Sequence, residues 1–183
     1  MLYENIAEEA ERIVKKYNER NPFRLCRDMD IIMLFQSMGS GEGAIKGFYF
    51  EACRIETITV NSDLPESVQK IIAAHELGHA LLHKTDGVRL FHETGLLDGS
   101  SQAEKEANFF AAELLVSDSE VLEALDQGRS FFSAAAELNV PPELLDFKLR
   151  MMKYKGYKLS DSPIYAENGF LKNICTDNKS QIF

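Results

Sequence analysis

The sequence contains two histidines, His75 and His79, whose spacing suits metal binding. Residues four apart on an α-helix are neighbours, with Cβ atoms about 5–6 Å apart. Both imidazoles can therefore reach one zinc ion at about 2.0–2.1 Å. Glu76 follows the first histidine directly, where a carboxylate can take a proton from water at the ion. The pattern His-Glu-x-x-His thus predicts a metal site with a general base beside it.

A catalytic zinc site needs a third protein ligand and an open position for water. His83 continues the same predicted helix but lies about 12 Å along its axis from His75, which is too far for one ion to bind both. We therefore expect His83 to pack against the site or support it. A third histidine ten residues after the first is excluded, because that position is Thr85. The remaining ligand should be a carboxylate from a later element.

Glu106 is the strongest candidate for this third ligand. It falls in a predicted helix from about Ser101 to Val116, on the shoulder of the apolar stripe, while Glu104 falls on the opposite shoulder. The competing interpretation of Glu106 is a solvated flank of the helix. The alternative ligands are Glu113, Glu104, Asp98 and His92.

The histidines lie on a predicted helix that begins after Asp63, a capping residue, and runs to about His83. Apolar residues cover nearly its whole circumference, so we expect it to be buried on most sides. Gly78 costs about 1 kcal/mol in helix propensity relative to alanine. This cost inside a buried helix predicts that another backbone or side chain passes close by.

The segments before this helix predict two helices and a hairpin. Apolar spacing indicates helices at about Leu2–Arg20 and Arg27–Met38, and β-branched and aromatic residues indicate strands at Ala44–Glu51 and Arg54–Val60. The hairpin should turn near Ala52-Cys53. Its second strand could pair with an extended substrate, although an ordinary edge strand of the sheet explains the same pattern.

After the candidate ligand helix, Ser117-x-x-Glu120 forms a capping box that predicts a short helix ending near Gly128. Two further helices, Ser130–Leu138 and Glu143–Tyr154, resemble a helix-turn-helix. Basic residues of the kind a DNA-binding module needs lie in and after the second: Lys148, Arg150, Lys153, Lys155 and Lys158. The pattern also suits any pair of helices, and the net charge is unfavourable for DNA binding, so a structural or partner-binding helix pair is favoured.

Composition excludes several functional classes. The net charge of −9 over 183 residues argues against general affinity for nucleic acids or anionic membranes. No apolar run reaches the length of a membrane-spanning helix, and the N-terminus lacks a secretory signal. The three cysteines are widely spaced, with no Cys-x-x-Cys pair, which fits a reducing compartment. We expect a cytoplasmic protein, and its oligomeric state is left open.

These patterns together predict an α+β fold. Residues 1–128 should form a mainly helical domain with a small antiparallel sheet, and the His-Glu-x-x-His pattern on its buried helix is typical of a zincin-like metalloprotease. Residues 129–156 should form the C-terminal helix pair, and residues 157–183 a polar, loosely ordered tail.

Two segments carry a resemblance to a known family. The run His75-Glu-Leu-Gly-His-Ala-Leu-Leu-His83, followed by Glu106-Ala-Asn-x-Phe-Ala-Ala-Glu-Leu-Leu115, resembles the ImmA/IrrE family of zinc metallo-endopeptidases. The likeness extends from about Phe48 to Leu115 and more weakly to Tyr157. Family members commonly have a proline shortly after the Leu-Leu pair, where this chain has Val-Ser-Asp. The capping box at this point should still separate the two helices.

The resemblance implies a complete site and a substrate. By this likeness His75, His79 and Glu106 bind one Zn²⁺, and Glu76 is the general base. The family typically cleaves helix-turn-helix repressors of phages, mobile elements or stress responses, so the expected partner is such a repressor. The alternative function is a non-enzymatic antirepressor or DNA-binding regulator with a structural metal.

Overall fold

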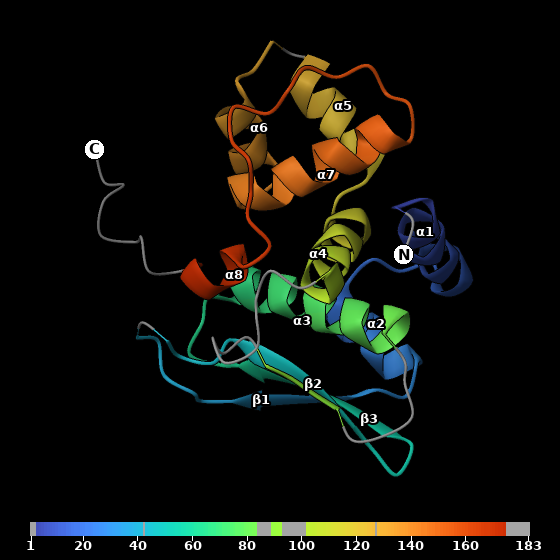
Figure 1. Ribbon diagram of the computed structural model, residues 1–183, viewed down its shortest axis with the longest axis vertical. Coiled ribbons are helices and arrows are strands. Elements are labelled where there is room, and N and C mark those ends of the chain that lie inside the picture. The colour runs from blue at the N-terminus through green and yellow to red at the C-terminus, as the bar shows by residue number, and fades with distance from the viewer. Residues whose placement is uncertain (1–2, 42, 84–88, 93–101, 127, 175–183) are drawn as a thin grey trace.

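The computed structural model describes residues 3–41, 43–83, 89–92, 102–126 and 128–174. Helices predominate, and a small sheet lies against one side of them (Figure 1). The elements are α1 (Tyr3–Tyr17), α2 (Pro22–Asp28), β1 (Ile32–Gln36), β2 (Gly47–Ala52), β3 (Ile55–Asn61), α3 (Glu66–Leu82), β4 (Arg89–His92), α4 (Gln102–Leu115), α5 (Asp118–Asp126), α6 (Phe131–Glu137), α7 (Pro142–Tyr154) and α8 (Phe170–Asn173). The predicted α+β, mainly helical fold is confirmed.

The sheet is mixed, whereas an antiparallel sheet was expected. Its strand order is β1-β3-β2-β4, with β2 antiparallel to both neighbours and β1 parallel to β3. The difference arises because Ile32–Gln36 is a strand and not the second half of a helix. The helix α2 ends at Asp28, and Asp30 then takes a left-handed backbone conformation with φ of 60°. Short apolar runs suit both helix and strand, so periodicity alone did not separate them.

The predicted hairpin is confirmed, but its second strand, β3, lies inside the sheet and not at its edge. β2 and β3 are joined by Cys53 and Arg54, which both have positive φ, as a tight hairpin turn requires. β3 is paired on one side with β1 and on the other with β2. The idea that β3 pairs with an extended substrate is therefore wrong, since both of its edges are already used.

The helix α3 forms the centre of the fold, between the sheet and α4 (Figure 1). Its residues are buried along most of its length, as the sequence predicted. Gly78 lies where α4 crosses: a Cβ atom built on it would be 3.2 Å from Ala107 Cα and 3.2 Å from Phe110 Cδ1. This confirms that another backbone passes close to the glycine.

The C-terminal helices share two cores through α7. One face of α7, with Phe147 and Met151, packs into the core that contains α1, α3 and α4. Its other face, with Leu149 and Met152, packs with α5 and α6. The expected capping box opens α5, since Glu120 N donates to Ser117 Oγ at 3.3 Å and Ser117 N donates back to the Glu120 carboxylate at 2.8 Å.

Residues 157–174 were expected to be loosely ordered, yet part of this segment is buried against the helices. Ala166, Phe170 and Leu171 are buried in the main core. The backbone N–H of Ala166 also donates to the Asp146 carboxylate at 3.0 Å. A few apolar anchors hold this segment, although its composition is polar. The expected tail from 175 to 183 lies outside the described residues. None of the described helices combines the length and apolar character needed to cross a membrane.

Candidate metal centre

The helix α3 brings His75 and His79 together inside the protein. Both side chains are buried, at 0% and 1% exposed, and their Nε2 atoms lie 3.1 Å apart. Burial lowers the pKa of His79 to about 4, against the opposing effect of a nearby carboxylate. The imidazole is therefore neutral at physiological pH, which is the form that binds a metal ion.

The carboxylate that meets this pair belongs to Glu104. Its Oε2 lies 3.2 Å from His75 Nε2, and its Oε1 lies 3.3 Å from His79 Nε2. Burial would raise the pKa of Glu104, but hydrogen bonds and charge interactions with the two histidines lower it overall. The group is therefore a carboxylate at neutral pH.

The spacing of these three groups fits one metal ion. Among the described residues, His75, His79 and Glu104 offer ligand atoms close enough to share an ion. Ligands at about 2.0–2.1 Å in a tetrahedral arrangement are separated from one another by about 3.3 Å. The observed separations of 3.1 to 3.3 Å agree with that value. Two imidazoles and one carboxylate are also a donor set typical of catalytic zinc, with the fourth position left for water.

Glu106, predicted as the third ligand, is placed beside a different histidine. Its Oε2 lies 3.0 Å from His83 Nε2, and its Oε1 accepts a hydrogen bond from Gln102 Nε2 at 2.9 Å. It is 4% exposed, so it is not a solvated flank either. The apolar stripe of α4 was correctly identified, but the shoulder of that stripe facing His75 and His79 is the one that carries Glu104.

Asn108 is a site residue that the sequence reasoning missed. Its Oδ1 lies 2.9 Å from His75 Nδ1, and its Nδ2 donates to the backbone oxygen of Asn168 at 2.6 Å. Because the amide nitrogen is used by a carbonyl, its oxygen faces the imidazole and accepts the Nδ1 proton. This leaves His75 Nε2 free of a proton and aimed at the site. The spacing Glu104-x-x-x-Asn108 places both residues on one side of α4, and that signal was available in the sequence.

Glu76, the predicted base, is buried where β2 approaches α3. Its side chain is 1% exposed. A Cβ atom built on Gly47 would lie 3.8 Å from Glu76 Cγ and only 2.4 Å from Ile72 Cγ2. The strand can therefore come this close to the base only because residue 47 is glycine.

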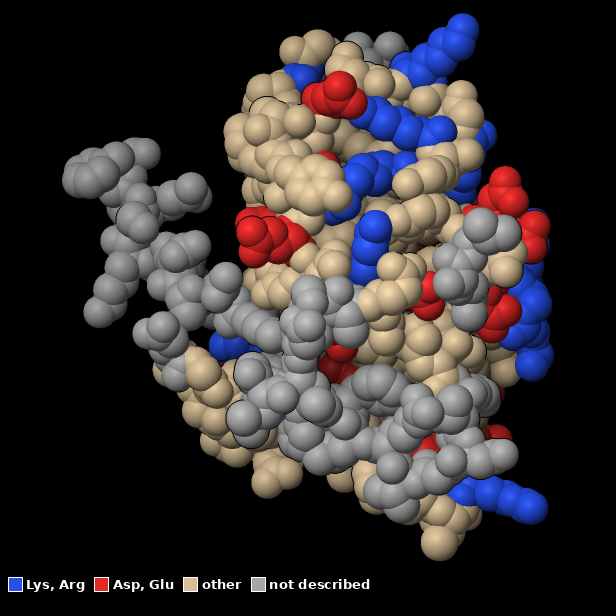
Figure 2. Space-filling model, in the orientation of Figure 1, with Lys and Arg blue, Asp and Glu red and all other residues tan. Residues whose placement is uncertain are grey.

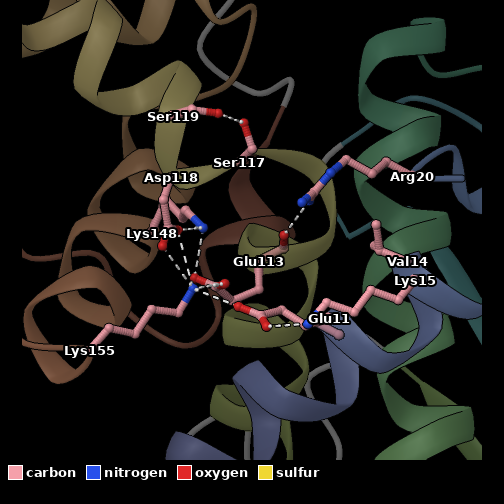
Figure 3. Close-up of a pocket in the computed structure, with 11 residues that line it drawn as sticks. Glu11, Val14, Lys15, Arg20, Glu113, Ser117, Asp118, Ser119, Lys148 and Lys155 are labelled. Carbon is pink, nitrogen blue, oxygen red and sulfur yellow. Dashed lines mark hydrogen bonds and ion pairs between the residues drawn. The ribbon is translucent and has the colours of Figure 1, made fainter. Parts of the chain in front are cut away.

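Glu113, an alternative ligand, belongs to a buried ion network on another part of α4. Its Oε1 lies 2.8 Å from Lys148 Nζ, and its Oε2 lies 2.5 Å from Lys155 Nζ (Figure 3). Asp118 also approaches Lys148, at 2.6 Å. Glu113 thus balances the charges of Lys148 and Lys155, and its ion pairs are with these lysines and not with the histidines. Asp98 and the side chain of His92 lie outside the described part of the chain.

The basic residues of the possible helix-turn-helix are largely engaged within the protein. Lys148 and Lys155 belong to the network just described, Arg150 pairs with Asp146 at 2.9 Å, and Lys153 pairs with Asp161 at 2.5 Å. On the face shown in Figure 2, basic side chains gather on the upper part of the molecule, with acidic ones mostly beside and below them. The ion pairs within the protein reduce the positive charge available to a phosphate backbone.

Comparison with known proteins places most of the chain in one family. The family model described as the IrrE N-terminal-like domain, a peptidase family, matches residues 26–150. An uncharacterized immunity region protein 2 of Bacillus phage phi105 is 32% identical over 146 residues, covering 80% of this chain and 90% of that protein. The metallopeptidase ImmA of Bacillus subtilis (strain 168) is 30% identical over 147 residues, covering 79% of this chain and 83% of the relative. No solved structure matches the chain.

Proposed function

The chain belongs to the family of the IrrE N-terminal-like domain, and from that premise we propose that it is a zinc-dependent endopeptidase acting in the cytoplasm. The observation that carries the proposal is the cluster of His75, His79 and Glu104, whose ligand atoms have the mutual spacing of zinc ligands. Glu76 lies on the same helix, next to the first histidine.

The residues of the cluster would each have a distinct role in peptide hydrolysis. His75, His79 and Glu104 would hold the ion. When bound, zinc lowers the pKa of water toward about 7 and polarises a carbonyl oxygen. Glu76 would accept the proton of the attacking water and return it to the leaving amine, as general base and then general acid. Its burial beside β2 keeps bulk solvent away from the carboxylate.

The hydrogen bonds around the two imidazoles prepare them for this task. Asn108 accepts from His75 Nδ1, and His83 lies 3.1 Å from His79 Nδ1. Each partner favours the proton on Nδ1 and leaves Nε2 available as a ligand. Such partners fix the tautomer and the orientation of metal-binding histidines.

The proposed substrate is a helix-turn-helix transcriptional repressor of a phage, mobile element or stress response. One relative is named for the immunity region of a phage and another as a metallopeptidase. The internal pairing of the basic residues in α7 supports a protease acting on protein over a DNA-binding regulator.

A comparison of the wild type with Glu76→Gln tests this function. Each purified protein is incubated with candidate helix-turn-helix repressors from the same genome, with and without a chelator, and cleavage is followed by mass spectrometry. The wild type should cleave and lose activity with the chelator. Glu76→Gln should keep its zinc but cleave at least about 100-fold more slowly, because general base catalysis contributes about 10²–10⁴-fold.

A reporter gene controlled by the same repressor, assayed with both proteins, identifies the alternative. If both proteins relieve repression equally without cutting the repressor, the chain is an antirepressor and the protease proposal is wrong. A wild type that holds no metal would also refute it.

A further inference from the structure

A chain of contacts runs from the metal-binding histidine His79 to a buried carboxylate. His79 Nδ1 lies 3.1 Å from His83 Nδ1, and His83 Nε2 lies 3.0 Å from Glu106 Oε2. We propose that His83 and Glu106 act in series as positioning residues that orient His79 and strengthen its bond to the metal. The inference rests on the proposed zinc site and assigns roles to two residues outside its ligand set.

The contacts fix the positions of the protons once His79 binds a metal ion. If His79 binds the ion through Nε2, its Nδ1 carries the proton and must donate it. The acceptor is His83 Nδ1, so the proton of His83 lies on Nε2. That N–H then donates to Glu106 Oε2. The other oxygen of Glu106 accepts from Gln102 Nε2, so both oxygens act as acceptors, as in a carboxylate. With the proton of His79 on Nδ1 and the proton of His83 on Nε2, both contacts are hydrogen bonds.

The surroundings make this chain effective. The side chains of His83 and Glu106 are only 13% and 5% exposed, so water screens their interaction weakly. Gln102 Nε2 donates to the other carboxylate oxygen at 2.9 Å and holds Glu106 in place. A carboxylate behind His83 makes its Nδ1 a stronger acceptor, and the electron density at His79 Nε2 rises in turn.

The two metal-binding histidines are thus supported differently. His75 Nδ1 is hydrogen-bonded to the neutral amide of Asn108. His79 Nδ1 is hydrogen-bonded to the imidazole of His83, which in turn contacts the carboxylate of Glu106. Loss of the charge should therefore weaken zinc binding even if every hydrogen bond can still form.

Zinc affinity of four variants tests the proposal. His83→Gln and Glu106→Ala should each bind zinc about 10–100-fold more weakly, the range found for such supporting partners. The zinc affinity of the double variant should lie within about 3-fold of that of the weaker-binding single variant, because the two residues act in series. Glu106→Gln should fall between wild type and Glu106→Ala, since its amide oxygen still accepts a hydrogen bond without the charge. Affinity is measured by competition with a chromogenic chelator in the absence of substrate.

Two controls keep the test decisive. Glu123→Ala removes an exposed carboxylate on α5 and should leave zinc affinity unchanged. Thermal unfolding of the metal-free proteins shows whether a variant has merely lost stability.

A separate experiment on the zinc-loaded wild type needs no variant. There, ¹⁵N NMR should find the proton of His83 on Nε2 and that of His79 on Nδ1.

Several results would overturn the inference. Losses that multiply in the double variant would show independent roles, and unchanged affinity in both single variants would show that the pair only packs. The opposite tautomer of His83 would break the proposed chain. A wild type that binds zinc tightly but cleaves nothing refutes only the proposed function, whereas one that binds no zinc refutes both.

Discussion

Two glutamates only two residues apart on α4 face different histidines. Glu104 meets His75 and His79, while Glu106 meets His83. Residues two apart on a helix point about 200° apart around its axis, so the two carboxylates approach α3 at different places. At this scale the identity of the third ligand is a question of which side of α4 faces α3.

Replacement of each glutamate by alanine distinguishes these roles. Glu104→Ala removes a proposed ligand, so it should weaken zinc binding by more than the about 10–100-fold expected for loss of a supporting residue. Glu106→Ala should stay within that smaller range. Metal content after dialysis and chelator competition provide the measurements. The reverse order would mean that Glu106 binds the ion.

The close approach of α3 and α4 brings the ligands together at the scale of elements. A Cβ on Gly78 would meet Ala107 Cα at 3.2 Å and the backbone oxygen of Ala107 at 3.3 Å. The contact involves backbone atoms, which cannot rotate away as a side chain can. Glycine therefore sets the distance across which Glu104 reaches the histidines.

Enlarging this residue should separate the helices. Gly78→Val should destabilise the metal-free protein by about 1–3 kcal/mol, the usual cost of overpacking, and should also weaken zinc binding. Gly78→Ala should change stability less, because a gain of about 1 kcal/mol in helix propensity offsets the tighter contact. Urea unfolding and zinc titration measure the two effects. Wild-type stability in Gly78→Val would show that α4 does not pack this closely.

At the scale of the whole molecule, a charged network joins the two hydrophobic cores. Glu113 on α4 and Asp118 on α5 share Lys148 and Lys155, which come from α7 and its C-terminal end (Figure 3). Lys148 is 1% exposed, and the carboxylates of Glu113 and Asp118 compensate its buried positive charge. The network thus ties the helix carrying Glu104 to the C-terminal helices.

The network should make stability depend on acid pH through Asp118. Burial raises the pKa of Asp118, but hydrogen bonds and attraction from Lys148 and Lys155 lower it overall. A lowered native pKa gives stability that is fully present above the ordinary aspartate value of about 3.9 and is lost as pH falls through the native pKa.

The variant Asp118→Asn isolates this contribution. Asp118→Asn should be less stable than wild type at pH 7, and the difference should shrink as the pH falls to 3. Urea unfolding of the metal-free proteins at pH 7, 5 and 3 gives the comparison. A constant difference across this range would exclude an ionised Asp118 as its source.

The amino-acid sequence by itself determined the features that depend on local spacing. His75, Glu76 and His79 lie together because their spacing along one helix requires it. The hairpin turn and the capping box at Ser117 follow from short-range chemistry in the same way. The cost of glycine in a buried helix also correctly predicted a close neighbour at Gly78.

Only the tertiary structure decided which residues from distant segments complete the centre. The choice between Glu104 and Glu106 depends on how α4 is rotated against α3, and both shoulders of its apolar stripe satisfy the same pattern. The strand β1 likewise forms by pairing with β3. The apolar run Ile32–Gln36 suits a helix as well as a strand, so the sequence alone does not predict this pairing. Spacing along one helix fixes neighbours within it, whereas contacts between helices depend on packing and crossing geometry.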